Sequence, residues 1–95
     1  MAACIVFIRE RTHNPSELKI HSEKAPAAME GHAVTPLAVY GRQEVIEGPE
    51  VEGAAILEFP TFEEAKAWYD SPAYREAREH RFKGANYRSF IVEGV

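Results

Sequence analysis

The stretch "EFPTFEEAKAWYDSPAY", residues 58–74, decides how this chain folds. Its apolar strand pattern stops at Pro60, because a proline has no backbone N–H to donate to a neighbouring strand. Thr61 and Glu64 then have the spacing of a capping box, which marks the start of a helix. Ser71–Pro72 supplies a second cap followed by a first-turn proline, so the helix should restart there. The stretch therefore predicts a strand that leads directly into a broken helix.

The segments at the two ends of the chain predict strands that are covered on both faces. Residues 3–10, "ACIVFIRE", and residues 86–95, "NYRSFIVEGV", carry apolar side chains on both alternating sides. Two further strands are predicted at residues 34–40 and 54–59, with a short edge strand at residues 45–46 between them. The chain therefore offers four main strands and one minor one.

Residues 14–29 predict the first helix. Asn14 is suited to be its N-cap, and Pro15 occupies the first helical position. Pro26 is expected to kink or end the helix, because its ring clashes with the preceding turn. An apolar stripe with one imidazole in it recurs at helical spacing and should face the core; it consists of Leu18, His21, Ala25 and Met29.

The order of these elements, β-α-β-β-α-β, is the ferredoxin-like arrangement. The predicted fold class is α+β, a single domain over residues 1–95 with a four-stranded antiparallel sheet and helices on one face. The other face would carry apolar side chains from residues 4–8, 54–59 and 89–93 into water. A second copy related by a two-fold axis is the simplest cover, so we expect a homodimer through the sheet face.

Charge and length argue against two kinds of partner. The 95 residues carry a net charge of −4, and the basic run "YREAREHRFK" is interleaved with Glu76 and Glu79. Nucleic acid is therefore not expected, because phosphate binding needs clustered cations. The apolar run "AACIVFI" near the N-terminus is too short to span a bilayer, so no membrane is expected either.

The single cysteine, Cys4, indicates a reducing, cytoplasmic setting. It cannot form an internal disulfide, and no second cysteine supports a zinc motif. His13, His32 and His80 do not share the spacing of metal ligands. No phosphate-binding glycine loop and no Gly-x-Ser-x-Gly motif is present. We therefore expect neither a metal nor a cofactor.

Several motifs together are similar to one known family. They are "NPSE" at residues 14–17, "KAP" at 24–26, "EG" at 47–48, the run "LEFPTFEEAKAWYDSPAY" with Arg81 beyond it, and the terminal "VEGV". On these residues the chain resembles the domain of unknown function 1330, within the dimeric α/β-barrel superfamily, over nearly its whole length. The resemblance implies a ferredoxin-like fold and a dimer whose sheets meet face to face. It implies no activity, because the family has no assigned reaction.

The chain departs from this family where a pocket would be shaped. Family members often carry aromatic residues on the first helix where this chain has Leu18 and His21, and an Arg-Gly-Gly where it reads Val39-Tyr40-Gly41. Relatives in the superfamily include cofactor-independent monooxygenases, lactone isomerases and haem enzymes, which commonly place ligands between sheet and helices. The resemblance thus implies a small-molecule site there, by analogy of fold.

His21 and Arg81 are the polar candidates for that site. His21 could act as a general base or hydrogen-bond a ligand, or it could be a satisfied core histidine. Arg81 follows Tyr74 by two helical turns, so its guanidinium could hold a ligand carboxylate. We expect instead that Arg81 forms an internal ion pair with Glu58 or Glu93.

The aromatic candidates are Tyr40, Trp68, Tyr69 and Tyr74, which could form a pocket wall for a flat, apolar metabolite. Aromatic residues at helical spacing also make an ordinary core, so both interpretations stand.

Three functions remain open. The chain could bind a small apolar or carboxylated metabolite, or it could be a cofactor-independent isomerase or monooxygenase-like enzyme that uses His21. It could also be a purely structural or interaction dimer. A closed cavity between sheet and helices, lined by His21, Tyr69 and Arg81, would argue against the last.

Overall fold

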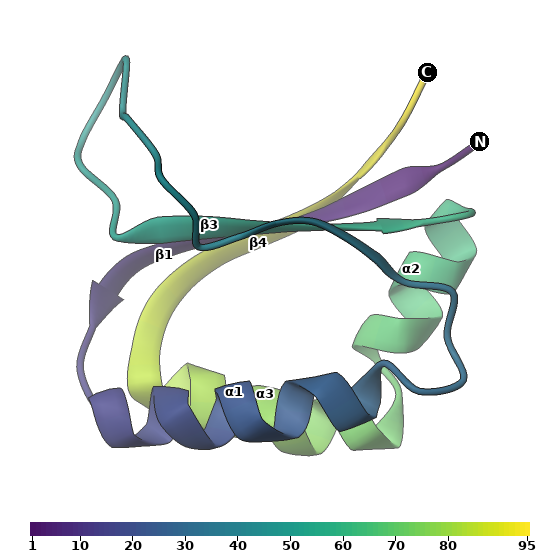
Figure 1. The fold of residues 1–95 in the computed structure, drawn as a ribbon, viewed down its shortest axis with the longest axis horizontal. Coiled ribbons are helices and arrows are strands. Elements are labelled where there is room, and N and C mark those ends of the chain that lie inside the picture. The colour runs from purple at the N-terminus through teal and green to yellow at the C-terminus, as the bar shows by residue number, and fades with distance from the viewer.

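Seven elements make up the computed structural model, which describes residues 1–95. They are β1 (Ala3–Thr12), α1 (Pro15–Ala28), β2 (Thr35–Val39), β3 (Gly53–Phe59), α2 (Phe62–Tyr69), α3 (Pro72–Gly84) and β4 (Ala85–Glu93). The strands form one antiparallel sheet in the order β2-β3-β1-β4. Figure 1 shows the helices gathered on one side of this sheet. The predicted α+β, ferredoxin-like arrangement is confirmed, with the second helix broken into α2 and α3.

All three helices begin at the predicted N-caps. The side chain of Asn14 accepts a hydrogen bond from the backbone N–H of Ser16 at 3.1 Å. Thr61 Oγ1 accepts from the N–H of Glu64 at 3.1 Å, and Ser71 Oγ accepts from the N–H of Tyr74 at 3.3 Å. Each cap satisfies a donor that the first turn of a helix leaves free.

The structure decides between the two alternatives for Pro26, and it shows that one predicted strand is wrong. Helix α1 does not end at Pro26 but continues to Ala28, whose carbonyl accepts a hydrogen bond from Trp68 Nε1 at 3.1 Å. The indole thus satisfies a carbonyl in the last turn of α1. No strand forms at residues 45–46, because this part of the chain lies in an irregular loop where the Ile46 side chain is exposed and Gly48 takes a left-handed φ of 93°.

The sheet has one covered face and one open face. The side chains of Ala3, Ile5 and Phe7 in β1 point towards the helices and are buried, as are Ala55, Leu57 and Phe59 in β3. The alternate residues form the outer face, where Cys4, Val6 and Ile8 are half-buried. Strand β4 pairs Phe90 with Val6 and Val92 with Cys4, so these two side chains join the same outer face, at 51% and 49% exposure.

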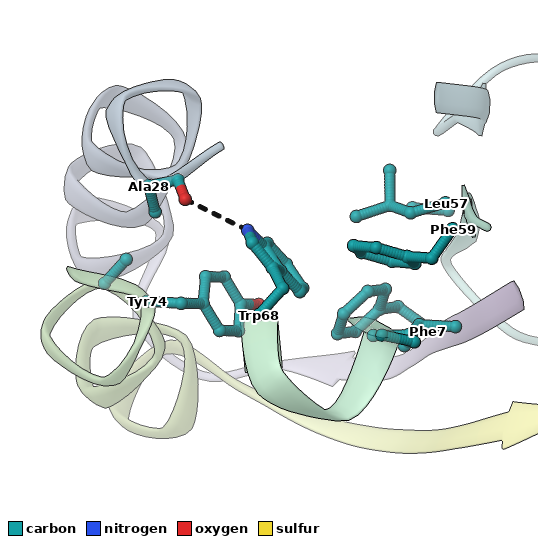
Figure 2. Packing of buried hydrophobic residues seen from close by; sticks show 10 residues of the cluster. Phe7, Ala28, Leu57, Phe59, Trp68 and Tyr74 are labelled. Atoms are coloured by element: carbon teal, nitrogen blue, oxygen red, sulfur yellow. Dashed lines mark hydrogen bonds between the residues drawn. The ribbon is translucent and has the colours of Figure 1, made fainter. Parts of the chain in front are cut away.

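The core is built around Trp68, which is 1% exposed. Its ring stacks on Tyr74 with 4.1 Å between the ring centroids, and the Phe59 ring lies 5.5 Å away on another side. Figure 2 shows the indole between the helices and the aromatic and aliphatic side chains of the sheet. Helix α2 therefore carries the residue that joins α1, α3 and the sheet.

Helices α1 and α3 are joined along their length. The Nδ1 atom of His80 lies 2.6 Å from Oε2 of Glu17, and Lys24 Nζ lies 2.9 Å from Oε1 of Glu76. At the start of α1, the backbone N–H groups of His13 and Asn14 donate to the carbonyl of Gly84. The contact with Glu17 leaves His80 half-buried.

Candidate ligand-binding site

A cavity of about 220 Å³ lies between the sheet and the helices. Helix α1, strands β1 and β3, the end of β2, and helices α2 and α3 all contribute to its wall, which is mostly apolar. The lining residues are Phe7, His21, Ser22, Ala25, Pro26, Met29, Val39, Tyr40, Ala55, Leu57, Trp68, Tyr74 and Arg81.

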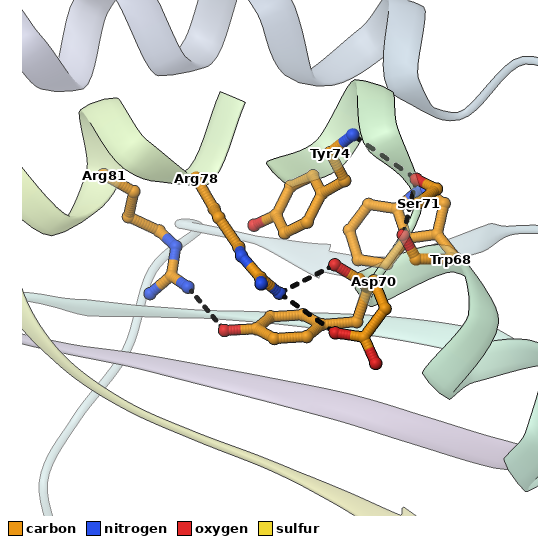
Figure 3. A network of polar contacts seen from close by, with 7 residues as sticks. Trp68, Asp70, Ser71, Tyr74, Arg78 and Arg81 are labelled. Carbon is orange, nitrogen blue, oxygen red and sulfur yellow. Dashed lines mark hydrogen bonds and ion pairs between the residues drawn. The ribbon is translucent and has the colours of Figure 1, made fainter. Parts of the chain in front are cut away.

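The structure brings five of the six residues singled out from the sequence to this cavity; they are His21, Tyr40, Trp68, Tyr74 and Arg81. The sixth, Tyr69, lies outside the lining and contributes to a second hollow of about 200 Å³ beside β4. Its hydroxyl accepts a hydrogen bond from Nη2 of Arg81 at 3.2 Å, as Figure 3 shows. Tyr69 therefore lies outside the cavity and contacts Arg81, one of the residues of its wall.

Arg81 is buried to 2% exposure and has no carboxylate partner within the chain. Its only side-chain hydrogen bond is the one to Tyr69, and its Nε atom is buried without a partner. The guanidinium carbon lies 5.2 Å from the ring centroid of Phe7, 5.1 Å from that of Phe82 and 4.7 Å from that of Tyr87. Aromatic faces stabilise the charge in part, but they give the buried Nε–H no hydrogen-bond acceptor.

The expected ion pair of Arg81 with Glu58 or Glu93 is wrong. Glu58 pairs with Cys4 in the sheet, so strand alternation carries its side chain to the outer face, away from α3. Glu93 is exposed. The residue of β4 that lies against Arg81 is Tyr87, and Glu93 comes six residues after it. Since a strand rises about 3.3 Å per residue, Glu93 lies on the order of 20 Å further along it.

The neighbouring arginine of α3 behaves differently. Arg78 Nη1 donates to the carbonyl of Tyr69 at 2.9 Å and to Oδ1 of Asp70 at 3.3 Å (Figure 3). Its guanidinium also stacks on the Tyr69 ring at 4.4 Å. Arg78 thus has its own anion, and Arg81, one turn later, has none.

His21 and Tyr74 form a weakly bonded polar pair in the wall. Nε2 of His21 lies 3.4 Å from the hydroxyl oxygen of Tyr74, and the two rings meet edge to face. Burial lowers the pKa of His21 to about 4, and the charges of Arg81 and His80 act in the same direction. Burial raises the pKa of Tyr74 to about 12, although Arg81 opposes this rise. Both groups are therefore uncharged at neutral pH.

Tyr40 closes one end of the cavity region. Its hydroxyl lies 2.6 Å from the hydroxyl of Tyr87, and the guanidinium of Arg9 lies over its ring at 4.7 Å. A Cβ atom on Gly53 would lie 3.0 Å from the Tyr40 ring, so glycine lets the ring lie closer to the strand than a larger residue would. Burial raises the pKa of Tyr40, and its backbone takes a left-handed φ of 52°.

Several parts of the site were missed in the sequence. Ala25 and Met29 were not among the predicted site residues, although they line the cavity. They belong to the same predicted apolar stripe as His21, and this shared stripe could have indicated them. Gly53 could have been noticed, because a glycine in a strand often marks a close approach of another group. Tyr87 had no local signal, since only the folded sheet brings it to Arg81 and Tyr40.

No group of three or more His, Cys, Asp or Glu side chains comes together in a way that could hold a metal ion. No helix has both the length and the apolar character needed to cross a membrane.

The fold and the cavity define the chain as a ferredoxin-like α+β domain with a mostly apolar cavity between its sheet and its helices. A family model described as Domain of unknown function (DUF1330) matches residues 4–95. The chain therefore belongs to this family, as its motifs predicted. None of the curated proteins matches the chain.

Crystal structures of other proteins are similar to this chain at low sequence identity. A protein of unknown function from Rhodopseudomonas palustris is 17% identical with a TM-score of 0.74, and the match covers 99% of this chain and 82% of that one. A dimeric ferredoxin-like protein of unknown function from Thermobifida fusca is 10% identical with a TM-score of 0.68, covering 99% and 92%. SnoaB, a cofactor-independent oxygenase from Streptomyces nogalater, is 7% identical with a TM-score of 0.64, covering 99% and 93%. At these identities the likeness shows the fold alone.

Proposed function

We propose that this protein binds a small, largely apolar carboxylic acid in the cavity between sheet and helices, and that it does so as a homodimer. The observation that carries the proposal is Arg81, a buried guanidinium at the cavity wall with no anion of its own. A guanidinium cannot lose its proton at neutral pH, so it cannot escape the cost of burial by becoming neutral. A ligand carboxylate would supply the missing charge.

A carboxylate suits this position better than other groups. It can accept hydrogen bonds from a guanidinium in pairs, which adds both energy and orientation. The three aromatic rings around Arg81 offer only their faces to the cation, so a bound carboxylate would add hydrogen-bond acceptors that these rings do not supply.

The cavity also limits the size of the ligand. Its volume of about 220 Å³ is below the range of about 300–1,000 Å³ that is usual for drug-sized ligands. The rest of the wall is made mostly of aliphatic and aromatic side chains, among them Leu57, Met29 and Trp68. A compact acid with an apolar body fits such a wall.

Two measurements test the proposal. Native mass spectrometry of the protein purified from its own host should detect a retained small acid. In a thermal shift assay, phenylacetate should raise the melting temperature of the wild type, since a ligand of the folded state stabilises it by mass action. The rise should vanish in Arg81→Met and persist in Arg75→Met, which removes an exposed arginine of the same helix. Equal shifts in both variants would contradict a role for Arg81.

The proposed dimer is supported by the outer face of the sheet. Half-buried Val6 and Ile8 and half-exposed Phe90 and Val92 make this face apolar, and the helices cover only the other side. Figure 1 also shows the loop between β2 and β3 rising on the open side, so that it would border an approaching partner. A second sheet packed there would bury these side chains and the half-buried thiol of Cys4. We also propose the reducing cytoplasm as the setting.

Binding is favoured over catalysis by the state of His21. A general base works best when its pKa lies near the working pH, and burial holds the pKa of His21 at about 4. A cofactor-independent enzyme remains the alternative, and a turnover that is lost in His21→Phe while the fold stays intact would favour it. A purely structural dimer is disfavoured, because it gives no reason to leave a cavity beside an unpaired buried cation.

A further inference from the structure

We propose that the acid is a monocarboxylate with an uncharged hydroxyl or carbonyl oxygen next to its carboxylate; Arg81 holds the carboxylate, and His21 and Tyr74 bind the second oxygen. This inference rests on the function proposed above, and it narrows the class of ligand. It makes His21 and Tyr74 determinants of specificity.

The polar groups of the cavity lie together rather than being spread around the wall. His21 Nε2 is 3.4 Å from the Tyr74 hydroxyl, and Tyr74 carries that hydroxyl towards Arg81 (Figure 3). Apart from these groups the lining is largely hydrophobic. A ligand whose carboxylate meets Arg81 therefore has its neighbouring atoms, rather than its far end, within reach of the other two side chains.

His21 and Tyr74 leave each other poorly satisfied. Their contact of 3.4 Å is longer than the usual hydrogen-bond range of about 2.5–3.2 Å. A neutral imidazole has one donor and one acceptor, and a phenol has one donor and two lone pairs. The pair can therefore donate to a carbonyl oxygen, or donate to and accept from a hydroxyl.

The charges in the cavity favour an uncharged group next to the carboxylate of the ligand. Arg81 is the one fixed charge of the lining; His21 and Tyr74 face it from α1 and α3, and Tyr40 faces it from the end of β2. His80 on α3 is not part of the lining and contacts Glu17 instead. The lining contains no second Lys or Arg, so a second carboxylate would find no permanent counter-ion.

Three related acids test this inference on the wild-type protein. Phenylacetate, mandelate and phenylmalonate share a phenyl ring and a carboxylate, and they differ in carrying a hydrogen, a hydroxyl or a second carboxylate on the same carbon. The fluorescence of Trp68, which is the only tryptophan and lines the cavity, reports binding. One mandelate enantiomer should bind about tenfold more tightly than phenylacetate. Phenylmalonate should bind more weakly than phenylacetate.

Variants assign the effect to the two side chains. His21→Leu and Tyr74→Phe should each bring the affinity for mandelate down to that for phenylacetate, whereas His32→Leu, the same change on an exposed histidine, should not. Circular dichroism checks the fold, and His21→Leu alone suffices if Tyr74→Phe fails to fold, since Tyr74 is part of the core.

The outcomes separate the two proposals. Equal binding of phenylacetate and both enantiomers of mandelate, or phenylmalonate binding as tightly as mandelate, would overturn this inference and leave the proposed function standing. Failure of all three acids to bind would contradict the proposed function as well.

Discussion

The hydroxyl of Tyr40 reaches the hydroxyl of Tyr87 at 2.6 Å, although the two residues come from opposite edges of the sheet. Tyr40 follows the edge strand β2, and Tyr87 lies in the other edge strand, β4. On the two inner strands, Arg9 pairs with Gly53 on one side and with Tyr87 on the other. The Tyr40 ring lies against Gly53 and Arg9 on its way to Tyr87. The contact closes the end of the sheet beside the cavity.

Gly53→Ala should disturb this contact. A new Cβ atom would lie 3.0 Å from the Tyr40 ring, so the ring has to shift by a few tenths of an ångström, which should strain its contact with Tyr87. We expect a loss of about 1–3 kcal/mol in the free energy of unfolding, measured by urea denaturation. Gly41→Ala is the matched control, because nothing lies within 4 Å of its added Cβ. Equal stabilities of the two variants would show that Tyr40 adapts without cost.

His21 should make the stability of the protein depend on pH. Burial lowers its pKa from 6.5 to about 4 in the folded protein, so the unfolded chain binds a proton more readily. The stability that comes from the neutral imidazole is present above about pH 6.5, falls as the pH drops, and is lost by about pH 4. Urea denaturation across this range should show a weaker pH dependence in His21→Leu than in the wild type. His32→Leu should keep the wild-type dependence, and if it does not, the slope belongs to other groups.

His21→Leu should also hold or raise the stability at neutral pH. A half-buried imidazole with one long hydrogen bond is replaced by an aliphatic group that needs no partner. Thermal unfolding of the protein without ligand measures this. A loss well beyond about 1 kcal/mol would mean that the bond to Tyr74 contributes more than its length indicates.

Double-mutant cycles should separate the two arginines of α3. Arg81→Met combined with Glu58→Gln or Glu93→Gln should show a coupling energy within about 0.5 kcal/mol of zero, because neither glutamate pairs with Arg81. Arg78→Met combined with Asp70→Asn should show a coupling of about 0.2–1 kcal/mol, as is usual for a partly exposed ion pair. Clear coupling of Arg81 to either glutamate would restore an internal partner and weaken the proposed acid site.

A charge on the outer face should prevent dimer formation. Phe90→Glu places a carboxylate in the middle of the proposed apolar interface, where it would be buried without a partner. Light scattering should find the wild type as a dimer at micromolar concentration and Phe90→Glu as a monomer. Phe62→Glu, an exposed residue at the start of α2, should leave the dimer intact. A wild-type monomer would contradict the interface altogether.

Local signals predicted most of the fold. The caps at Asn14, Thr61 and Ser71 depend on side chains within three residues of the groups they bind, so the sequence contains the whole interaction. In β1 and β3, successive side chains point to opposite faces of the sheet, so the position of a residue in the strand predicts its face. The prediction of a short strand at residues 45–46 was wrong, because two consecutive apolar residues do not show whether another strand lies beside them in the fold.

The partner of Arg81 could not be predicted in the same way. Helical spacing placed Arg81 and Tyr74 on the same side of α3, which the structure bears out, but it left the choice between a glutamate and a ligand open. That choice depends on which face of the sheet Glu58 occupies and how far along β4 Glu93 lies. Both are properties of the assembled sheet rather than of any short segment.

The two pairs that join α1 to α3 also determine the direction in which these helices can pack. Glu17 contacts His80, and Lys24 contacts Glu76. The glutamate therefore comes before the basic residue in the sequence of both helices, and the contacts pair the early residue of one helix with the late residue of the other. If α1 were reversed end for end against α3, Glu17 would face Glu76 and Lys24 would face His80. Two carboxylates would then repel at one position, and His80 and Lys24 would each lose the glutamate that they contact. The reversed arrangement is therefore less favourable, which favours the antiparallel pairing of the two helices.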